Sequence, residues 1–191
     1  MQVNPDFYYI PTGIDRDVAE IIKKQCATLP LEKSVINTAD NKNPKLDIQW
    51  RNSENSWLST DCWIAGIMKH FIECANKNFF HYDISEWSDK IQYTVYNGGR
   101  THYSWHNDIS EATINKDYIR KLSISLLLSD PEEYEGGEFQ LMFAGDSQMR
   151  TFKPQMGDAI IFSSNTRHRV RPVKSGKRIS LVGWYAGPPF R

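Results

Sequence analysis

The sequence has few of the features that would assign a protein to a class at once. Its three cysteines, Cys26, Cys62 and Cys74, are odd in number and form no disulfide framework, so we expect the reduced, buried thiols of a cytoplasmic protein. No apolar stretch approaches the ~18 residues of a membrane span. The opening "MQVNPDFYYIP" has no basic region before an apolar run, and we therefore expect no secretory signal.

The sequence also lacks an excess of charge of either sign. Lys+Arg and Asp+Glu number 23 each, which gives a net charge of zero. Because proteins that mainly grip nucleic acid usually carry a basic excess, this balance argues against that class. The length of 191 residues favours a single domain, residues 1–191, that can bury a core without staples.

The first part of the chain has the apolar spacing of helices. Residues 14–26 predict a helix that ends before Pro30, and Asp17 with Glu20 resembles a capping box. A second apolar face predicts a helix over about residues 60–79. Between the two, the polar, turn-rich segment 37–47 predicts an exposed loop.

After residue 83 the pattern changes to short β-branched or aromatic segments, separated by turn signals such as "NGG", "EGG" and "KSGK". Many short strands at such intervals favour a sandwich or barrel. The order predicts an α+β fold, with a helical N-terminal part (1–82) packed on one face of a β core (83–191). The predicted strands are 90–96, 122–128, 137–143, 158–164, 167–173 and 178–186.

A His-x-Asp-Ile-Ser string occurs twice, with His81 and Asp83 in the first copy and His106 and Asp108 in the second. A histidine and a carboxylate two residues apart share a face on a strand, whereas on a helix they lie about 200° apart. The first copy directly follows the helical pattern and has no third ligand in a convincing pattern nearby. We interpret it as a decoy with a surface histidine. The second copy follows a strand that ends at Tyr96 and a glycine turn, and it predicts an extended segment.

A third ligand for the second copy stands at His168, after a strand that begins with a Gly-Asp turn. His102 would share the face of His106 but lies roughly 13 Å away along the strand, too far for the same ion. Two histidines and a carboxylate form the facial triad of non-haem iron oxygenases, whereas a structural zinc site needs a fourth ligand, usually Cys. The predicted metal ligands are His106, Asp108 and His168.

Arg178 stands ten residues beyond His168, and Ser180 shares its face on a strand. A buried arginine needs an anionic partner. A five-carbon dicarboxylic acid could chelate the metal at one end and meet the guanidinium of Arg178 at the other. Taken alone, Arg178 would be a surface arginine after the "KSGK" turn, but its spacing from His168 favours the binding role.

Three blocks within residues 79–186 resemble the Fe(II)- and 2-oxoglutarate-dependent oxygenases, specifically the prolyl 4-hydroxylase-like branch with its PKHD-type hydroxylases. The blocks are "IQYTVYNGGRTHYSWHND", "KLSISLLLSDPEEYEGGEF" and "GDAIIFSSNTRHRVRPVKSGKRISLVGWY". The resemblance implies a double-stranded β-helix, the jelly roll of cupins, with iron on the three predicted ligands. It also implies that Arg178 binds the distal carboxylate of 2-oxoglutarate, with Tyr96 on the same carboxylate and Ser180 as a further candidate.

The same resemblance implies an activity. The expected reaction hydroxylates an unactivated C–H with O2, most simply in a prolyl residue of a peptide or protein, and releases succinate and CO2 from 2-oxoglutarate. Ascorbate is the implied reductant. Many eukaryotic prolyl hydroxylases use Lys at this position, whereas Arg178 of this chain resembles the Arg of the PKHD-type enzymes. The identity of the substrate therefore stays open. The candidate substrate-pocket residues are Tyr103, Trp184, Gln92 and Thr94. Gln92 and Thr94 are equally well explained as core residues of the barrel.

Two other functions remain open at this point. A nucleic-acid demethylase would use the same triad, with "RHRVR" (167–171) as a phosphate-contacting strip, although solvated arginines on a strand explain that strip as well. A cupin-like binding module would keep the barrel without the chemistry. The polar segment 37–56 is either a lid over the substrate or a plain surface loop. Substrate identity, oligomeric state and the role of the N-terminal third cannot be predicted from the sequence.

Overall fold

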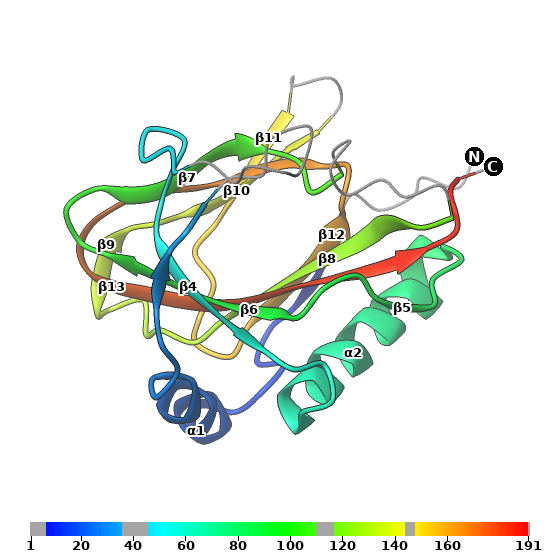
Figure 1. Ribbon diagram of the computed structural model, residues 1–191, viewed down its shortest axis with the longest axis horizontal. Coiled ribbons are helices and arrows are strands. Elements are labelled where there is room, and N and C mark those ends of the chain that lie inside the picture. Colours follow the sequence, from blue (N-terminus) through cyan, green and yellow to red (C-terminus); the bar gives the residue numbers. More distant parts are fainter. Residues whose placement is uncertain (1–6, 36–45, 110–116, 144–147, 191) are drawn as a thin grey trace.

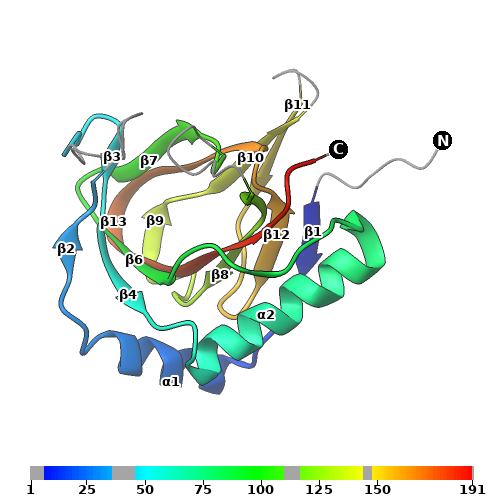
Figure 2. The same ribbon diagram turned by 45° about the vertical axis from the view of Figure 1, so that its right-hand side comes forward.

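The computed structural model describes residues 7–35, 46–109, 117–143 and 148–190. These residues form a curved sandwich of two β-sheets with helices beneath it (Figures 1 and 2). The helices are α1 (Arg16–Cys26) and α2 (Trp63–Ala75), and α2 continues into the π-helix η1 (Asn76–Phe80). The strands are β1 (Phe7–Ile10), β2 (Glu32–Lys33), β3 (Arg51–Asn52), β4 (Glu54–Leu58), β5 (Glu86–Trp87), β6 (Ile91–Asn97), β7 (Thr101–His106), β8 (Ile119–Leu127), β9 (Tyr134–Gly136), β10 (Phe139–Phe143), β11 (Gln148–Phe152), β12 (Ala159–Ser163) and β13 (Arg167–Gly187).

The strands divide into a major and a minor sheet that share β13. The major sheet has the order β1-β12-β8-β13-β6-β4-β2, and it uses the C-terminal half of β13. The minor sheet has the order β11-β10-β13-β7-β3, and it uses the N-terminal half. All strand pairs within the described residues are antiparallel. Two antiparallel sheets closed around one interior are a jelly roll, so the predicted fold class is confirmed.

Strand β13 corrects the prediction of two strands at 167–173 and 178–186. It is continuous for 21 residues and curves from the minor sheet into the major one (Figure 1). The predicted "KSGK" turn lies inside it. Gly176 has φ +73, a left-handed conformation that costs glycine little, and the register shifts between Val173 and Ser175. The glycine therefore bends the strand without ending it. The bend allows this single strand to pair within both sheets.

The two helices cover the outer face of the major sheet. The predicted capping box is wrong, because α1 begins at Arg16 after an extended Asp15, which places Asp17 and Glu20 inside the helix. Burying an aliphatic side chain contributes about 1.5–3 kcal/mol, so the shared core holds the helices firmly on the sheet. That core contains helical Ala19, Ile22, Ile64, Met68 and Ile72, and strand residues Ile124, Leu126 and Ile161.

The N-terminal part is not helical throughout, which corrects the predicted division at residue 82. β1 pairs with β12, β4 pairs with β6, and β3 pairs with β7, so the first third supplies strands to both sheets. β3 and the first three residues of β4 also fall inside the segment 37–56 that we predicted as loop or lid; residues 37–45 of that segment lie outside the described residues. The polar sequence of this stretch led us to predict a loop, but Ser53 and Asn55 are buried and hydrogen-bonded rather than exposed.

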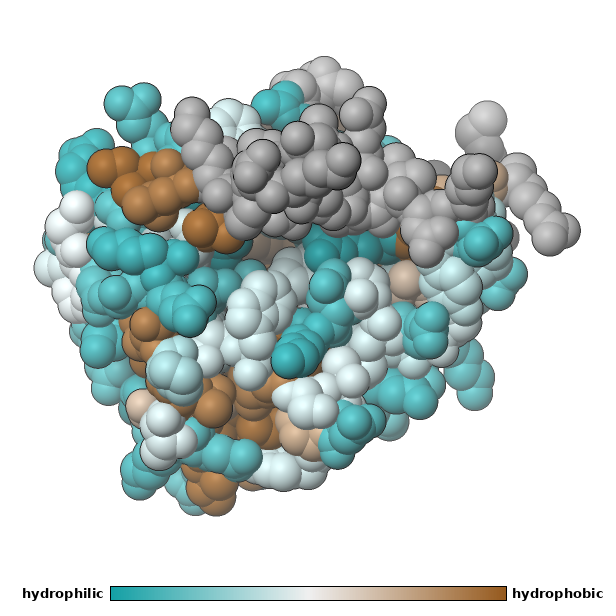
Figure 3. Space-filling view, viewed as in Figure 1, coloured by the Kyte–Doolittle hydropathy of each residue, from teal (hydrophilic) through white to brown (hydrophobic). Residues whose placement is uncertain are grey.

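On the face viewed in Figure 3, hydrophobic side chains lie in separate groups among hydrophilic ones. None of the helices in the described part of the chain is both long and apolar enough to cross a membrane. The cysteines are unpaired; Cys26 is buried, as expected, whereas Cys62 and Cys74 are only partly buried.

Candidate metal centre

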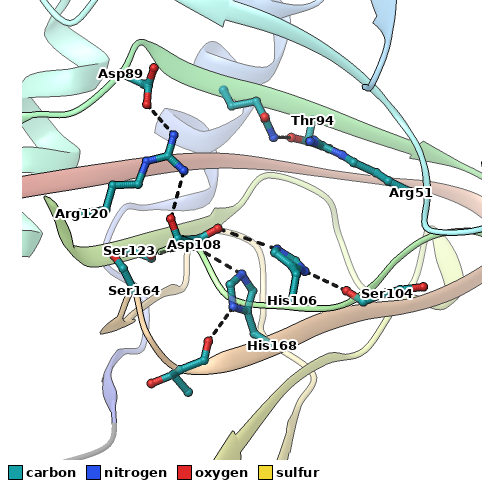
Figure 4. Close-up of polar contacts among 12 residues, drawn as sticks. Arg51, Asp89, Thr94, Ser104, His106, Asp108, Arg120, Ser123, Ser164 and His168 are labelled. Carbon is teal, nitrogen blue, oxygen red and sulfur yellow. Dashed lines mark hydrogen bonds and ion pairs between the residues drawn. The ribbon is translucent and has the colours of Figure 1, made fainter. Parts of the chain in front are cut away.

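The three predicted metal ligands meet where β7 and β13 pair. His106 ends β7 and faces His168, its register partner on β13, while Asp108 follows β7 by two residues. His168 Nε2 lies 3.4 Å from Asp108 Oδ2, and His106 Nε2 lies 3.8 Å from Asp108 Oδ1. The three side chains turn toward one another (Figure 4), and their ligand atoms all lie within 4.8 Å. Within the described residues, no other group of three His, Cys, Asp or Glu is placed to hold a metal ion.

Both histidines present the nitrogen that a metal needs. Nδ1 of His106 lies 2.8 Å from the carbonyl oxygen of Ser104, and Nδ1 of His168 lies 2.9 Å from that of Thr166. A carbonyl only accepts, so each Nδ1 carries a proton, and each Nε2, which faces Asp108, is the nitrogen that can bind a metal. Burial, together with the charge of His168, lowers the pKa of His106 to about 3. His106 is therefore the neutral imidazole that ligates metals.

Asp108 is fixed from the side opposite the histidines. Ser123 Oγ lies 2.7 Å from Asp108 Oδ2, to which it donates, and 2.9 Å from Ser164 Oγ. The backbone N–H of Asp108 donates to the carbonyl oxygen of Ser164 at 2.8 Å. These contacts orient the carboxylate, as supporting hydrogen bonds do in metal sites.

The carboxyl of Asp108 is held in its charged form. Burial alone would raise its pKa, but His168, His106, Arg120 and the hydrogen bond from Ser123 outweigh burial and lower it. The site therefore offers one anionic oxygen ligand and two imidazole nitrogen ligands. That donor set fits Fe(II) with open coordination positions, and it lacks the closed fourth ligand of structural zinc.

Arg120, at the start of β8, joins this site to its surroundings. Its Nη1 donates to the backbone carbonyl of Asp108 at 3.4 Å, and its Nη2 forms an ion pair with Asp89 (Figure 4). The guanidinium also lies over the ring of Trp184, 4.2 Å from the centroid. Arg120 thus links the metal-ligand segment to an aromatic residue predicted for the substrate pocket.

A cavity of about 500 Å³ opens beside the three ligands and is also lined by Arg178. Arg178 is only 1% exposed, and its Nη1 donates to Ser180 Oγ at 3.2 Å. Its guanidinium lies 5.5 Å from the centroid of the Tyr96 ring, but its Nε has no hydrogen-bond partner. No carboxylate of the described residues forms an ion pair with it. A buried cation without a counter-charge is costly, so it marks a place for an anion.

Most of the other predicted residues line the same cavity. The ring of Tyr103 stacks on that of His106 at 3.6 Å and 17°, and Trp184 keeps an unpaired Nε1–H. Thr94 is the exception: it does not line the cavity and is fully buried, with its hydroxyl accepting from the Gln92 amide at 2.6 Å. The predicted residues that line the cavity are Tyr96, Ser180, Tyr103, Trp184 and Gln92.

Sequence reasoning missed the N-terminal wall of this cavity. Arg51, Asn55 and Trp57 from β3 and β4 line it, and so does Arg120. A polar stretch such as "RNSENSW" carries no period that separates a buried, hydrogen-bonded strand from a surface loop. Only the sheet topology reveals that β3 and β4 face the metal centre.

The "RHRVR" strip lies on β13, as predicted, but its arginines contact protein groups. Arg169 stacks over Trp105 at 4.6 Å and donates to Gln140 at 2.6 Å, and Arg171 pairs with Glu138 at 3.7 Å. These contacts explain the strip as part of the minor sheet. They do not favour a phosphate-binding role.

Comparisons with known proteins agree with this site. A family model described as the 2OG-Fe(II) oxygenase superfamily matches residues 91–186, half of the chain. A PKHD-type hydroxylase of Janthinobacterium sp. (strain Marseille) is 41% identical over 92 residues, which cover 47% of this chain and 39% of that relative. The match thus spans less than half of the relative's length.

Two solved structures share the fold. A prolyl-4-hydroxylase of Pseudomonas putida has a TM-score of 0.73 at 17% identity, covering 96% of this chain and 94% of that one. A prolyl hydroxylase of Trichoplax adhaerens, in complex with a peptide fragment of the hypoxia inducible factor oxygen degradation domain, has a TM-score of 0.70 at 18% identity, covering 96% and 84%.

Proposed function

Because the chain belongs to the 2OG-Fe(II) oxygenase superfamily, we propose that it is an Fe(II)- and 2-oxoglutarate-dependent dioxygenase that hydroxylates an unactivated C–H. The observation that carries the proposal is the shared cavity. Three convergent ligands stand on one side of it, and the buried, uncompensated guanidinium of Arg178 lines it too. A ligand with a metal-binding end and a distal carboxylate satisfies both features, and 2-oxoglutarate has both.

Each residue then has a defined task. His106, Asp108 and His168 would hold Fe(II), which with 2-oxoglutarate and O2 supplies the oxidising chemistry and releases succinate and CO2. Arg178 would bind the distal carboxylate through its two-pronged guanidinium, and Ser180 holds Arg178 in place at 3.2 Å. A carboxylate at this position would neutralise the buried charge.

Aromatic residues form the rest of the wall. Tyr96 would add a hydroxyl to the same carboxylate, and burial raises its pKa so that this hydroxyl keeps its proton. Tyr103, Trp184 and Trp57 also line the cavity, and apolar walls exclude water from the reacting C–H.

For the substrate we propose a prolyl residue of a peptide or protein. The relatives named above as prolyl hydroxylases support this, and one of them was solved with a peptide. An aromatic-lined cavity also suits a pyrrolidine ring. Ascorbate as reductant, a single domain over residues 1–191 and a cytoplasmic location belong to the same proposal.

The test is succinate formation from 2-oxoglutarate with Fe(II) in air, followed by mass spectrometry of a proline-containing peptide panel for a gain of one oxygen. We expect succinate in the wild-type reaction and none with His106→Ala. A wild-type protein that binds neither Mn(II) nor 2-oxoglutarate would reject the proposal. A non-catalytic cupin-like module would show no coupling between Mn(II) and 2-oxoglutarate in a calorimetric titration.

A further inference from the structure

Buried nitrogens without partners gather in this one cavity. Within the described residues, three side-chain nitrogens are buried and lack a hydrogen-bond partner: Arg51 Nη2, Arg178 Nε and Trp184 Nε1. All three residues line the cavity beside the metal centre. Since native proteins pair nearly all buried donors, the cluster indicates ligand acceptors at this place. The proposed cosubstrate accounts for Arg178, but it leaves Arg51 unexplained.

Arg51 is a buried cation that is held by neutral hydrogen-bonding groups. It is 7% exposed, on β3, outside the segment that the family model matches. Its Nε donates to Ser53 Oγ at 3.2 Å, Ser53 Oγ donates to Ser34 Oγ at 2.9 Å, and Ser34 Oγ donates to Asn55 Oδ1 at 3.2 Å. This network fixes the guanidinium without neutralising it.

No acidic side chain of the described residues is paired with Arg51. None lies within ion-pair distance of it. Glu32 lines the same cavity but is exposed and forms no ion pair with Arg51. The cavity therefore holds a second buried guanidinium that lacks a counter-charge, like Arg178.

Arg51 lies close to the metal ligands. Its guanidinium carbon lies 4.5 Å from the centroid of the Tyr103 ring, and that ring stacks on the metal ligand His106 at 3.6 Å. Figure 4 shows Arg51 extending inward from its strand, above His106. One aromatic ring thus separates the cation from a metal ligand. An anion held by Arg51 would therefore lie in the same cavity as the metal ligands.

We propose that Arg51 binds a carboxylate of the substrate, next to or one residue away from the hydroxylated carbon. A neutral peptide carbonyl would satisfy the unpaired N–H but would leave the buried charge uncompensated, whereas a carboxylate does both. The inference rests on the proposed function and narrows its substrate class. The carboxylate belongs either to the oxidised residue itself or to the residue that follows it.

Matched probes test this inference on the full chain loaded with Mn(II), which does not turn over, and 2-oxoglutarate. The probes are N-acetyl-L-proline and N-acetyl-L-prolyl-glycine, each as the free acid and as the neutral amide, and calorimetry measures binding. We expect one acid to bind at least ~10-fold more tightly than its amide, with a dissociation constant below ~10 mM. Whichever acid is favoured identifies the source of the carboxylate.

Arg51→Gln should remove this preference, bringing acid and amide within about twofold, because the guanidinium charge is lost. Lys33→Gln is the control: Lys33 lines the same cavity but is exposed, and its loss should leave the preference intact. The affinity of Arg51→Gln for 2-oxoglutarate, expected within about twofold of wild type, shows that the variant is folded and separates the two proposals.

Several outcomes overturn the inference while the oxygenase proposal stands. In each of them the wild-type protein binds Mn(II) and 2-oxoglutarate normally. The first is equal binding of acid and amide, or no binding of either acid. The second is an equal loss for acid and amide in Arg51→Gln, which would assign Arg51 to a neutral carbonyl. The third is loss of 2-oxoglutarate binding in Arg51→Gln, which would assign Arg51 to the cosubstrate.

Discussion

Two segments of this chain carry the same His-x-Asp-Ile-Ser string in opposite surroundings. His106 and Asp108 are largely buried, and their polar atoms contact the histidine, serines and carbonyls described above. His81 and Asp83 are exposed, and they belong to no metal-competent group within the described residues. Backbone conformation makes the difference: His106 ends a strand, whereas His81 ends a helix with φ +53. The string alone therefore says nothing about metal binding.

The first copy has a structural task instead. The backbone N–H of His81 donates to the carbonyl of Asn76 at 2.9 Å, and the Asn76 side chain bonds both the N–H and the carbonyl of Tyr82. The Asp83 carbonyl then lies so near Gly187 that a Cβ there would come within 2.0 Å of its oxygen. This segment turns the chain out of η1 and docks it on β13.

Exchanging one carboxylate in each copy should give the largest contrast. Asp108→Asn removes the anionic ligand, so Mn(II) affinity should fall by more than the ~10–100-fold that loss of a supporting hydrogen bond costs. Asp83→Asn should change it by less than about twofold, because Asp83 is exposed and belongs to no metal-competent group within the described part of the chain. Titration with Mn(II) in the absence of 2-oxoglutarate measures both. Similar losses in the two variants would remove the distinction between the copies.

The second copy also differs in sharing its cavity with Arg178. Arg178→Met should weaken 2-oxoglutarate binding about 100-fold, since a buried charge pair is worth roughly 2–5 kcal/mol when one partner is removed. Mn(II) affinity without 2-oxoglutarate should stay within about twofold, because Arg178 contacts none of the ligands. Arg171→Met, an exposed arginine on the same strand, is the matched control. Calorimetry would contradict the assignment if Arg178→Met bound 2-oxoglutarate as wild type does.

Part of the metal centre could be predicted from the alternation of an extended chain. Residues i and i+2 share a face, which predicted Ser180 beside Arg178 on β13. The same rule predicted Asp108 beside His106, although β7 ends at His106 and Asp108 follows the strand by two residues. The meeting of His106 with His168, sixty-two residues on, is a pairing across two strands that no local pattern specifies. The sequence offered His168 as a third ligand of the right type after a Gly-Asp turn, and the family resemblance then supported that choice. The observed register places the two histidines opposite each other.

The missed parts have physical reasons. Gly176 looked like a turn residue, but a bend within one long strand uses the same positive φ. Arg51 and Asn55 looked like surface residues, because sequence polarity cannot reveal that a hydrogen-bond network satisfies a buried strand. Both errors concern long-range pairing. The second error hid the wall of the cavity where we infer that the substrate binds.

The serines near the two copies allow a smaller contrast. Ser123→Ala removes the hydroxyl that donates to Asp108 at 2.7 Å, and Mn(II) affinity should fall about 10-fold. Ser85→Ala is the control from the first copy, where the hydroxyl bonds Tyr118 and a backbone carbonyl of Ala186. It should leave Mn(II) affinity unchanged. An unchanged affinity in Ser123→Ala would show that the carboxylate does not depend on this hydroxyl for its orientation.

The smallest expected effect is a change in the free energy of unfolding that comes from the backbone conformation of His81. A non-glycine residue in the left-handed region is strained, and glycine is not, so His81→Gly should raise the free energy of unfolding by about 1 kcal/mol. His81→Ala keeps the Cβ and its strain, and should show no such gain. Urea denaturation of both variants compares them, and Mn(II) affinity should stay at the wild-type level in each. If the alanine variant were as stable as the glycine variant, the backbone of His81 would not be under strain. If either variant lost Mn(II), the first copy would be more than a turn.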